Sequence, residues 1–312
     1  DWSSDVCSSD LSLPDSELDI LELVNLKKCI NSSKDMEQWE MSPAYNQIFS
    51  VLQLLNNSVQ SKGRSSQYPK RPIITALLEV LKNTKKILDE VEPLKQPMRF
   101  GNKAFRIFLT KVFEQRFDLL KGVTDNKEVC DYYVQCFGSW TRIDFGTGHE
   151  FNFLAFITSL AVLGLIEPED GPAIVFDVFW EYWNLHVAIK EKYNLEPAGS
   201  HGAWSVDDYV CLPFVFGSSQ LIGNENITPA NVIDPTVSKN NKDEYSYCRW
   251  IDYLYHDKVG PFAEHSRMLY SLRNLPHFTK LNGGMIKMYQ GEVMDRFLVV
   301  QHFRFGTILK WE

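Results

Sequence analysis

The sequence predicts an all-α protein in which many short-to-medium helices form a single globular fold. Apolar residues recur at helical spacing over most of the 312-residue chain, whereas the alternating pattern of half-buried strands is scarce. The 14 prolines fall mostly between the periodic segments, as expected for a residue that interrupts helices. With 44% hydrophobic and 13% aromatic residues, the chain can bury a sizeable core.

The chain begins with a segment that we exclude from the predicted fold. Residues 1–11 (DWSSDVCSSDL) resemble the translation of a sequencing adapter, so we expect a disordered artefact before a domain at residues 12–312. A polar natural terminus is the alternative, and it leads to the same expectation. Helical spacing then predicts helices at 16–26, at 35–60 as a pair divided by Pro43, and at 72–92 after the polar linker 61–70.

The later helices are predicted from the same spacing. A break with two prolines at 92–101 precedes expected helices at 102–120, 126–135, 151–165, 169–193, 245–257, 265–273 and 284–295. The polar residues at 236–242 predict a surface loop, and the region from about 197 to 241 is a candidate inserted part.

Charge and cysteine content exclude several classes of protein. The net charge of −8 and the scattered basic residues argue against a partner that is nucleic acid or an anionic membrane. The longest apolar run, at 151–166, falls short of the roughly 20 residues that a membrane span needs. The six cysteines form no C-x-x-C pair, which favours a reduced intracellular compartment, cytoplasmic or also nuclear, and disfavours a zinc site.

One glycine-rich stretch, FGSWTRIDFGTGHE at 137–150, predicts a binding loop. Three glycines lie among charged and polar residues, and glycine is favoured where backbone must approach another group closely. The loop leads into the apolar segment at 151–165, so His149 and Glu150 would lie in the first turn of a buried helix, where free N–H groups can bind an anion. A phosphate-loop signature is absent, and a structural turn that enters a core helix is the alternative.

Acidic residues in a second stretch, LEPAGSHGAWSVDDYVCLPFVFGSSQL at 195–221, also have two interpretations. Asp207 and Asp208 follow Ser205 and could form the capped start of a helix. A hard cation such as Mg²⁺ also prefers oxygen ligands, usually one or two carboxylates with water and phosphate oxygens. In the first stretch, Arg142 and Asp144 could likewise simply pair with each other.

Together with three further blocks, these stretches carry a family resemblance. The blocks are FGNKAFR at 100–106, GPFAEHS at 260–266 and KMYQGEVMDRFLVVQHFRFG at 287–306. In this order they resemble the phosphotyrosyl phosphatase activator family over residues 100–311. The resemblance implies an all-α fold with core, linker and lid parts around a deep cleft.

The resemblance also implies a set of ligands for ATP and magnesium. Arginine suits a phosphate because its planar fork donates several hydrogen bonds and stays charged. Two positions depart from the family pattern: Trp140 replaces a usually small residue and is expected to narrow the mouth of the cleft, and Lys310 stands where proline is common. By resemblance the nucleotide contacts are Arg142, Thr147, Gly148, Ala263, Glu264, Gln301 and His302, and the magnesium ligands are Gly202, through its carbonyl, and Asp208.

The function implied by the resemblance is activation of type 2A serine/threonine protein phosphatase. The expected partner is the phosphatase catalytic subunit, with or without its scaffold subunit, and the expected activity is that of an ATP- and magnesium-dependent chaperone. The family is also described as a peptidyl-prolyl cis-trans isomerase, which would act on a Pro-containing peptide. No hydrolase or metalloprotease motif is present, but isomerisation needs no nucleophile, and its catalytic residues stay unassigned. A non-catalytic helical scaffold for the phosphatase is the alternative.

Overall fold

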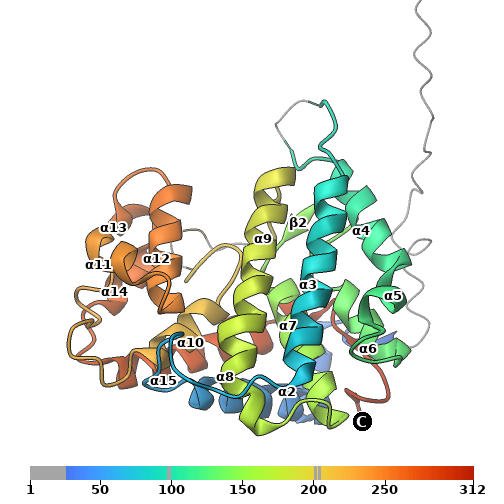
Figure 1. The fold of residues 1–312 in the computed structure, drawn as a ribbon, viewed down its shortest axis with the longest axis horizontal. Coiled ribbons are helices and arrows are strands. Elements are labelled where there is room, and N and C mark those ends of the chain that lie inside the picture. Colours follow the sequence, from blue (N-terminus) through green and yellow to red (C-terminus); the bar gives the residue numbers. More distant parts are fainter. Residues whose placement is uncertain (1–25, 97–99, 200–201, 203–204) are drawn as a thin grey trace, which may run out of the picture.

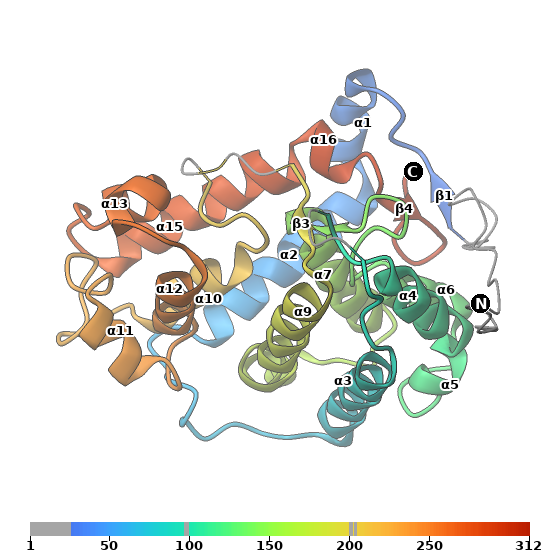
Figure 2. The same ribbon diagram turned by 90° about the horizontal axis from the view of Figure 1, so that it is seen from above.

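A computed structural model describes residues 26–96, 100–199, 202 and 205–312, and in that part it confirms the all-α prediction. Two views place α11–α14 at one end of the molecule and α4–α6 at the other, with α7 and α9 between them (Figures 1 and 2). Within the described ranges, no helix combines the length and the apolarity needed to cross a bilayer. The artefact predicted at 1–11 and nearly all of the helix predicted at 16–26 lie outside these ranges.

Helices predicted in the first half of the chain are mostly confirmed. The pair around Pro43 is present because Pro43 starts the second helix and the Ser42 hydroxyl accepts a hydrogen bond from the Tyr45 N–H at 3.1 Å. The elements are β1 (Lys27–Lys28), η1 (Ser33–Asp35), α1 (Met36–Met41), α2 (Pro43–Ser58), α3 (Pro72–Glu90), α4 (Ala104–Glu114), α5 (Arg116–Leu120), α6 (Lys127–Val134) and β2 (Asp144–Phe145).

The single helix predicted at 102–120 is wrong, because the chain breaks it at Gln115 into α4 and α5. Arg116 accounts for the break: its guanidinium donates to the Phe113 carbonyl at 2.7 Å and to the Asp131 carboxylate of α6 at 2.9 Å. The central carbon of the Arg116 guanidinium lies 3.8 Å from the centre of the Phe113 ring. These contacts draw the turn towards α6.

The second half of the chain carries more helix than predicted. The polar segment expected to be a loop at 236–242 is instead the helix α11, because the Asp234 carboxylate caps the N–H groups of Thr236 and Val237 at 2.8 and 3.2 Å. The elements are α7 (Thr147–Val162), η2 (Pro168–Asp170), α8 (Gly171–Ala173), η3 (Ile174–Phe179), α9 (Trp180–Tyr193), β3 (Glu196–Pro197), α10 (Leu212–Gln220), α11 (Pro235–Asn241), α12 (Ser246–Asp257), α13 (Phe262–His265), α14 (Arg267–Leu272), α15 (Phe278–Tyr289), η5 (Gln290–Met294), α16 (Phe297–Val300) and β4 (Arg304–Phe305).

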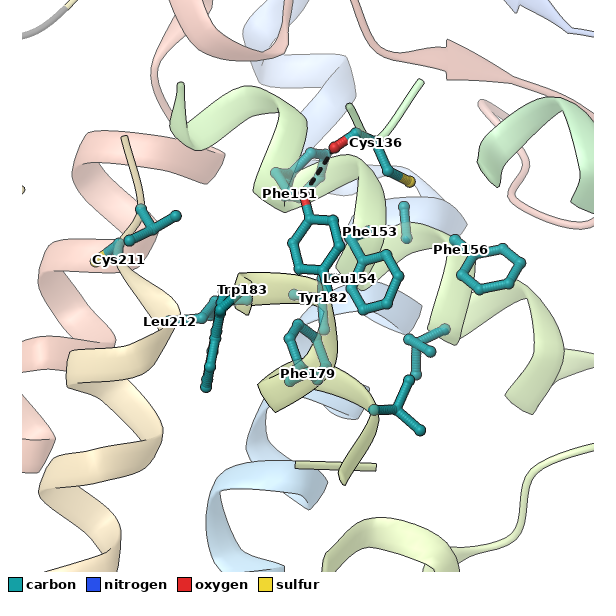
Figure 3. Close-up of a cluster of buried hydrophobic side chains, with 14 of the residues drawn as sticks. Cys136, Phe151, Phe153, Leu154, Phe156, Phe179, Tyr182, Trp183, Cys211 and Leu212 are labelled. Carbon is teal, nitrogen blue, oxygen red and sulfur yellow. Dashed lines mark hydrogen bonds between the residues drawn. The ribbon is translucent and has the colours of Figure 1, made fainter. Parts of the chain in front are cut away.

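The core is organised around α7. Residues 150–160 of this helix are all buried, which agrees with the continuous apolar pattern of the sequence. The Phe153 ring stacks on Tyr182 of α9 with the centroids 3.8 Å apart, and the Tyr182 hydroxyl donates to the Cys136 carbonyl at 2.7 Å (Figure 3). Because α7 is fixed on all sides, its first turn is a rigid support for the preceding loop.

Short strand pairs join distant parts of the chain. β1 pairs antiparallel with β4, and β2 pairs parallel with β3. The first pair brings the N-terminal part of the described chain next to its C-terminal end, as Figure 2 shows. The second pair places the residues after β3 beside the start of α7, because the Ala198 N–H donates to the Phe145 carbonyl at 2.8 Å.

Candidate functional site

The glycine-rich loop forms a tight turn that ends at the start of α7. The Ser139 N–H donates to the Asp144 carbonyl at 2.9 Å, and the Ile143 N–H donates to the Ser139 carbonyl at 2.9 Å. Gly138 has a φ of 126°, a value that glycine adopts without strain, and Ile143 has a φ of 55°. The turn is thus held in an unusual backbone conformation, as occurs at functional sites.

Arg106 of α4 fixes the outer side of the turn. Its guanidinium donates to the carbonyls of Trp140 and Thr141 at 3.0 and 2.9 Å and lies 4.6 Å from the centre of the Trp140 ring. Trp140 is only 3% exposed and packs into the core. The expectation that Trp140 narrows the mouth of a cleft is therefore wrong, because the indole points beneath Arg106.

Arg142 projects from the turn and connects two predicted blocks. Its Nε donates to Asp144 Oδ2 at 2.7 Å, so the simple pairing considered from the sequence is present. Its Nη1 also lies 3.3 Å from His302 Nε2, which comes from the chain after α16. Asp144 is buried, whereas the Arg142 side chain is 42% exposed, so Asp144 orients a guanidinium that still faces solvent.

The first turn of α7 lies close to two other segments. A Cβ atom on Gly146 would lie 2.9 Å from Ala198, and one on Gly148 would lie 3.2 Å from the Val299 carbonyl of α16. His149 Nδ1 accepts the Gly146 N–H at 3.1 Å. Burial, followed by the charges of Arg142 and His302, lowers the pKa of His149 to about 3. The imidazole is therefore neutral at neutral pH and has a structural role, as considered from the sequence.

Two neighbouring cavities open beside this turn. The smaller, of about 80 Å³, is lined by Arg142, Gly148 and His302 among the predicted nucleotide contacts. The larger, of about 390 Å³, is lined by Thr147 and by the predicted metal ligand Asp208. The two cavities share the wall formed by Ala198, Gly199, Arg296 and Val299. The loop at 137–150 and the segment around Asp208 thus meet at one site.

The two aspartates of the second block have different environments. The buried Asp207 carboxylate accepts the N–H groups of Tyr209 and Val210, both at 3.1 Å. These bonds hold a local turn and not the capped helix start considered from the sequence, because α10 begins only at Leu212, with Cys211 as its N-cap. Burial raises the pKa of Asp207. Both aspartates line the larger cavity, but Asp208 pairs with a cation: its Oδ2 accepts a hydrogen bond from Lys258 Nζ at 2.6 Å.

Glu150 connects the two halves of the site from inside the core. Its fully buried carboxylate accepts hydrogen bonds from the Trp183 indole at 3.0 Å and from the N–H groups of Cys211 and Leu212 at 2.7 and 3.0 Å. Burial raises the pKa of Glu150 to about 8 even though these three donors lower it. Since Cys211 and Leu212 come three and four residues after Asp208, Glu150 fixes the chain close to the Asp207–Asp208 pair relative to α7.

Four predicted ligands do not line either cavity. Ala263 and Glu264 lie on α13, and the α14 residue Met268, four positions after Glu264, reaches the larger cavity. Gln301 follows α16 and donates to the Leu298 carbonyl at 3.1 Å. The Gly202 carbonyl accepts the Ser205 hydroxyl at 2.7 Å. Their roles as ligands stay predictions.

Three charged residues of the cavities were missed by sequence reasoning. Lys287 and Glu292 line the larger cavity, and Arg296 lines both. They belong to a block that was singled out for its similarity, in which residues 287, 291, 292 and 296 repeat at helical spacing. That spacing places residues 287, 291 and 292 on one face of α15 and η5, with Arg296 two residues beyond η5, and it could have identified them.

The chemistry of the two cavities fits a nucleotide with a divalent cation. Arg142, Arg296 and the first turn of α7 present donors suited to phosphate oxygens. Asn152, which also lines the smaller cavity, has a buried Oδ1 with no partner in the described structure and could accept a ribose hydroxyl or an amino group. The described residues form no cluster of three metal-ligating side chains, so Asp208 would hold Mg²⁺ only together with phosphate oxygens and water.

Comparisons with known proteins agree in fold and in sequence. The family described as phosphotyrosyl phosphate activator (PTPA) protein matches residues 26–311. A serine/threonine-protein phosphatase 2A activator of Drosophila melanogaster is 33% identical over 93% of this chain and 75% of its own length. The serine/threonine-protein phosphatase 2A activator 1 of Schizosaccharomyces pombe is 37% identical over 90% of this chain and 89% of its own length.

A solved structure shows the same arrangement of helices. The crystal structure of the PP2A phosphatase activator Ypa1 PTPA1 is similar with a TM-score of 0.84 and 30% sequence identity, over 92% of this chain and 95% of that chain. The family match extends almost to both ends of the described residues, well beyond the five blocks that carry the resemblance in the sequence. The chain belongs to the phosphotyrosyl phosphate activator (PTPA) family.

Proposed function

We propose that this protein activates type 2A serine/threonine protein phosphatase by binding its catalytic subunit, with or without the scaffold subunit, in the cytoplasm or nucleus. The observation that carries the proposal is the similarity, along about nine tenths of the chain, to proteins named as activators of this phosphatase. The chaperone role requires that the protein bind one conformer of the phosphatase more tightly than another, since only differential affinity shifts a conformational equilibrium.

We further propose that activation depends on ATP and magnesium bound at the two cavities. Arg142 and Arg296 would neutralise phosphate charge, and Asp144 keeps the Arg142 fork in one orientation. Asp208 would hold the cation against the phosphates. Bound magnesium would supply further neutralisation of the triphosphate. Neutral His149 holds the turn before α7 without adding charge of its own.

Peptidyl-prolyl cis-trans isomerisation is a second proposed activity. The larger cavity has a volume within the ordinary range for small ligands, about 300–1,000 Å³, and apolar side chains such as Val206, Met268 and Met288 line it. An apolar groove of this kind could take a proline ring and desolvate the peptide bond, whose rotation barrier is about 18–20 kcal/mol. A scaffold that binds the phosphatase without nucleotide or isomerase activity is the alternative.

Reactivation of metal-depleted phosphatase tests the proposal. We expect the protein to restore activity to the metal-depleted catalytic subunit only when both ATP and Mg²⁺ are present. Arg142→Ala should weaken ATP binding about ten- to a hundredfold, because it removes a charge-assisted hydrogen bond worth roughly 1.5–3 kcal/mol. The ATP affinity of Arg142→Lys should lie between those of the parent and Arg142→Ala. Calorimetry with and without the phosphatase subunit gives the affinities.

The matched control is Arg273→Ala, because Arg273 is exposed and lines neither cavity. It should bind ATP as the parent does. If a related activator restores the phosphatase while this protein does not, the proposed function is wrong. If folded Arg142→Ala binds ATP as tightly as the parent in both settings, the turn at 137–150 has only a structural role.

A further inference from the structure

The carboxylate proposed to hold the metal already has a cationic partner within the chain. Lys258 Nζ lies 2.6 Å from Asp208 Oδ2, and the two side chains are only 17% and 18% exposed. Lys258 follows α12 directly, whereas Asp208 belongs to the segment that lines the larger cavity. Such a partly buried pair is screened less by solvent and salt than an ion pair at the surface.

A second ion pair lies next to the first, and here the residue at the end of α12 carries the negative charge. Asp257, the residue before Lys258, pairs with Lys190 of α9. Lys190 also donates to the Tyr253 hydroxyl at 2.9 Å and lies 4.9 Å from the centre of the Tyr209 ring. Two adjacent residues at the C-terminal end of α12, Asp257 and Lys258, therefore form ion pairs with other parts of the molecule, and the pair of Lys258 is with Asp208 of the site.

The position of Lys258 bears on the nearby predicted nucleotide contacts. The chain continues through Val259, which is 98% exposed, and Gly260, whose φ of 104° favours glycine, to α13 with Ala263 and Glu264. Phe262 packs on Tyr255 of α12 with ring centroids 5.0 Å apart. The end of α12 and α13 thus form one packed unit, which the Lys258–Asp208 pair connects to the larger cavity.

An ammonium group and a divalent cation compete for the same carboxylate. The oxygen that accepts a hydrogen bond from Lys258 presents the lone pairs that a hard cation would need, and the two positive charges repel at short distance. We propose that Lys258 is an internal counter-cation of Asp208 that a divalent metal must displace. Displacement breaks one of the two adjacent ion pairs at the C-terminal end of α12, so metal binding loosens the α12–α13 unit. This inference rests on the proposed assignment of the metal to Asp208.

Binding of Mn²⁺ in the presence of ATP, measured by electron paramagnetic resonance, tests the competition without any phosphatase, since Asp208 would hold the metal only together with phosphate oxygens. Lys258→Met keeps the length of the side chain but removes its charge, and we expect it to bind Mn²⁺ at least tenfold more tightly than the parent. Lys258→Arg should stay near the parent because the positive charge remains. The control is Lys242→Met, which removes a lysine paired with Asp252 of α12 at 3.0 Å and should leave the affinity unchanged.

Hydrogen exchange provides the second readout. Residues 258–265 should exchange faster in the parent when Mn²⁺ and ATP are added together, and equally fast in Lys258→Met without either. The inference is overturned if folded Lys258→Met binds Mn²⁺ no more tightly than the parent. It is equally overturned if this variant loses affinity for ATP alone, because Lys258 would then be a phosphate ligand. Asp208→Asn separates the two proposals: unchanged Mn²⁺ binding in this variant refutes the metal assignment itself, and the counter-cation role with it.

Discussion

Glu150 shows how a buried charged residue can organise a site without lining either cavity. All three of its hydrogen-bond donors come from outside its own helix, and two of them are the first N–H groups around the start of α10. The carboxylate therefore acts as a cap supplied by a different helix, and the dipole at the start of α10 favours its charge. Burial opposes this effect and dominates, since the pKa of Glu150 is raised to about 8.

The raised pKa of Glu150 predicts a fall in stability as the pH rises. Between its ordinary value of 4.5 and about 8, the folded protein holds a proton that the unfolded chain has released, so the free energy of unfolding decreases with rising pH. His149 and His186 have the opposite effect on stability, because burial lowers the pKa of each to about 3. Their effect is confined to pH values below their ordinary pKa of 6.5, where the unfolded chain binds the protons that the folded protein does not. The window from pH 7 to 8 therefore isolates Glu150 from the histidines.

Glu150→Gln should make the decrease between pH 7 and 8 smaller, measured by urea unfolding at several pH values. The variant should also be less stable at pH 7 by about 1–3 kcal/mol, because its amide nitrogen cannot accept a backbone N–H. Cys211 does not mask the effect, because its pKa is raised well above 9. Burial also raises the pKa of Asp207, but Asp207 is present in both the parent and Glu150→Gln, so the difference between their slopes reports Glu150. An unchanged slope in Glu150→Gln would assign the pH dependence to another group.

Residue chemistry could be predicted better than residue contacts. Arg142, Gly148 and His302 line one cavity, and the family resemblance of their blocks had implied that they belong to one site. The partner of Asp208 could not be predicted, since Lys258 lies 50 residues away in sequence and nothing local to either residue indicates the pairing. The partners of Glu150 could not be predicted either, because they depend on the position of the start of α10 relative to α7.

At the scale of elements, α10 and α12 pack closely where they cross at Gly217. A Cβ atom on Gly217 would lie 2.2 Å from the Tyr247 nitrogen and 2.7 Å from the Tyr247 Cβ, so only glycine fits between these helices. Neither atom belongs to the far end of a flexible side chain, and the crossing cannot adjust by a change of rotamer. This crossing connects the α10 segment next to the site with the helix that ends at Lys258.

Gly217→Ala should therefore destabilise the protein by about 1–3 kcal/mol, because the added methyl group forces two helix backbones apart. Gly283→Ala on α15 is the matched control, since a Cβ atom there meets nothing within 4 Å. The control should be neutral or more stable by up to about 1 kcal/mol, as alanine favours helix over glycine. Chemical unfolding monitored by circular dichroism measures both changes, and equal effects at the two positions would contradict this account.

The elements that were predicted correctly are those with long apolar periodicity, such as α3 and α7. The failures have local causes that outweigh periodicity. α11 has only one buried residue, so its cap at Asp234, not an apolar face, reveals it as a helix. The break between α4 and α5 depends on Arg116 binding Asp131 of α6, a contact that no window of sequence contains.

At the scale of the molecule, the ends of the described chain meet behind the site. Trp39 of α1 is fully buried against Phe303 and Phe305, with ring centroids 5.6 and 5.5 Å apart, and its indole N–H donates to the Met294 carbonyl at 2.7 Å. Phe303 directly follows His302, which contacts Arg142. Pairing between residues that are more than 250 positions apart is what closes the fold, and helical periodicity carries no information about it.

Trp39→Ala should therefore affect both stability and nucleotide binding, although Trp39 lines neither cavity. Removal of a buried indole should lower the free energy of unfolding by about 3–5 kcal/mol. The cavity left beneath Phe303 should also let His302 move away from Arg142, so we expect weaker ATP binding under conditions where the variant remains folded.

Gln38→Ala is the control, because Gln38 is exposed and its 2.9 Å hydrogen bond to Glu312 lies at the surface. Urea unfolding and calorimetry on the same samples separate the two effects. A variant that loses stability but binds ATP as the parent does would show that the contact between the two ends of the chain supports the fold and not the position of His302.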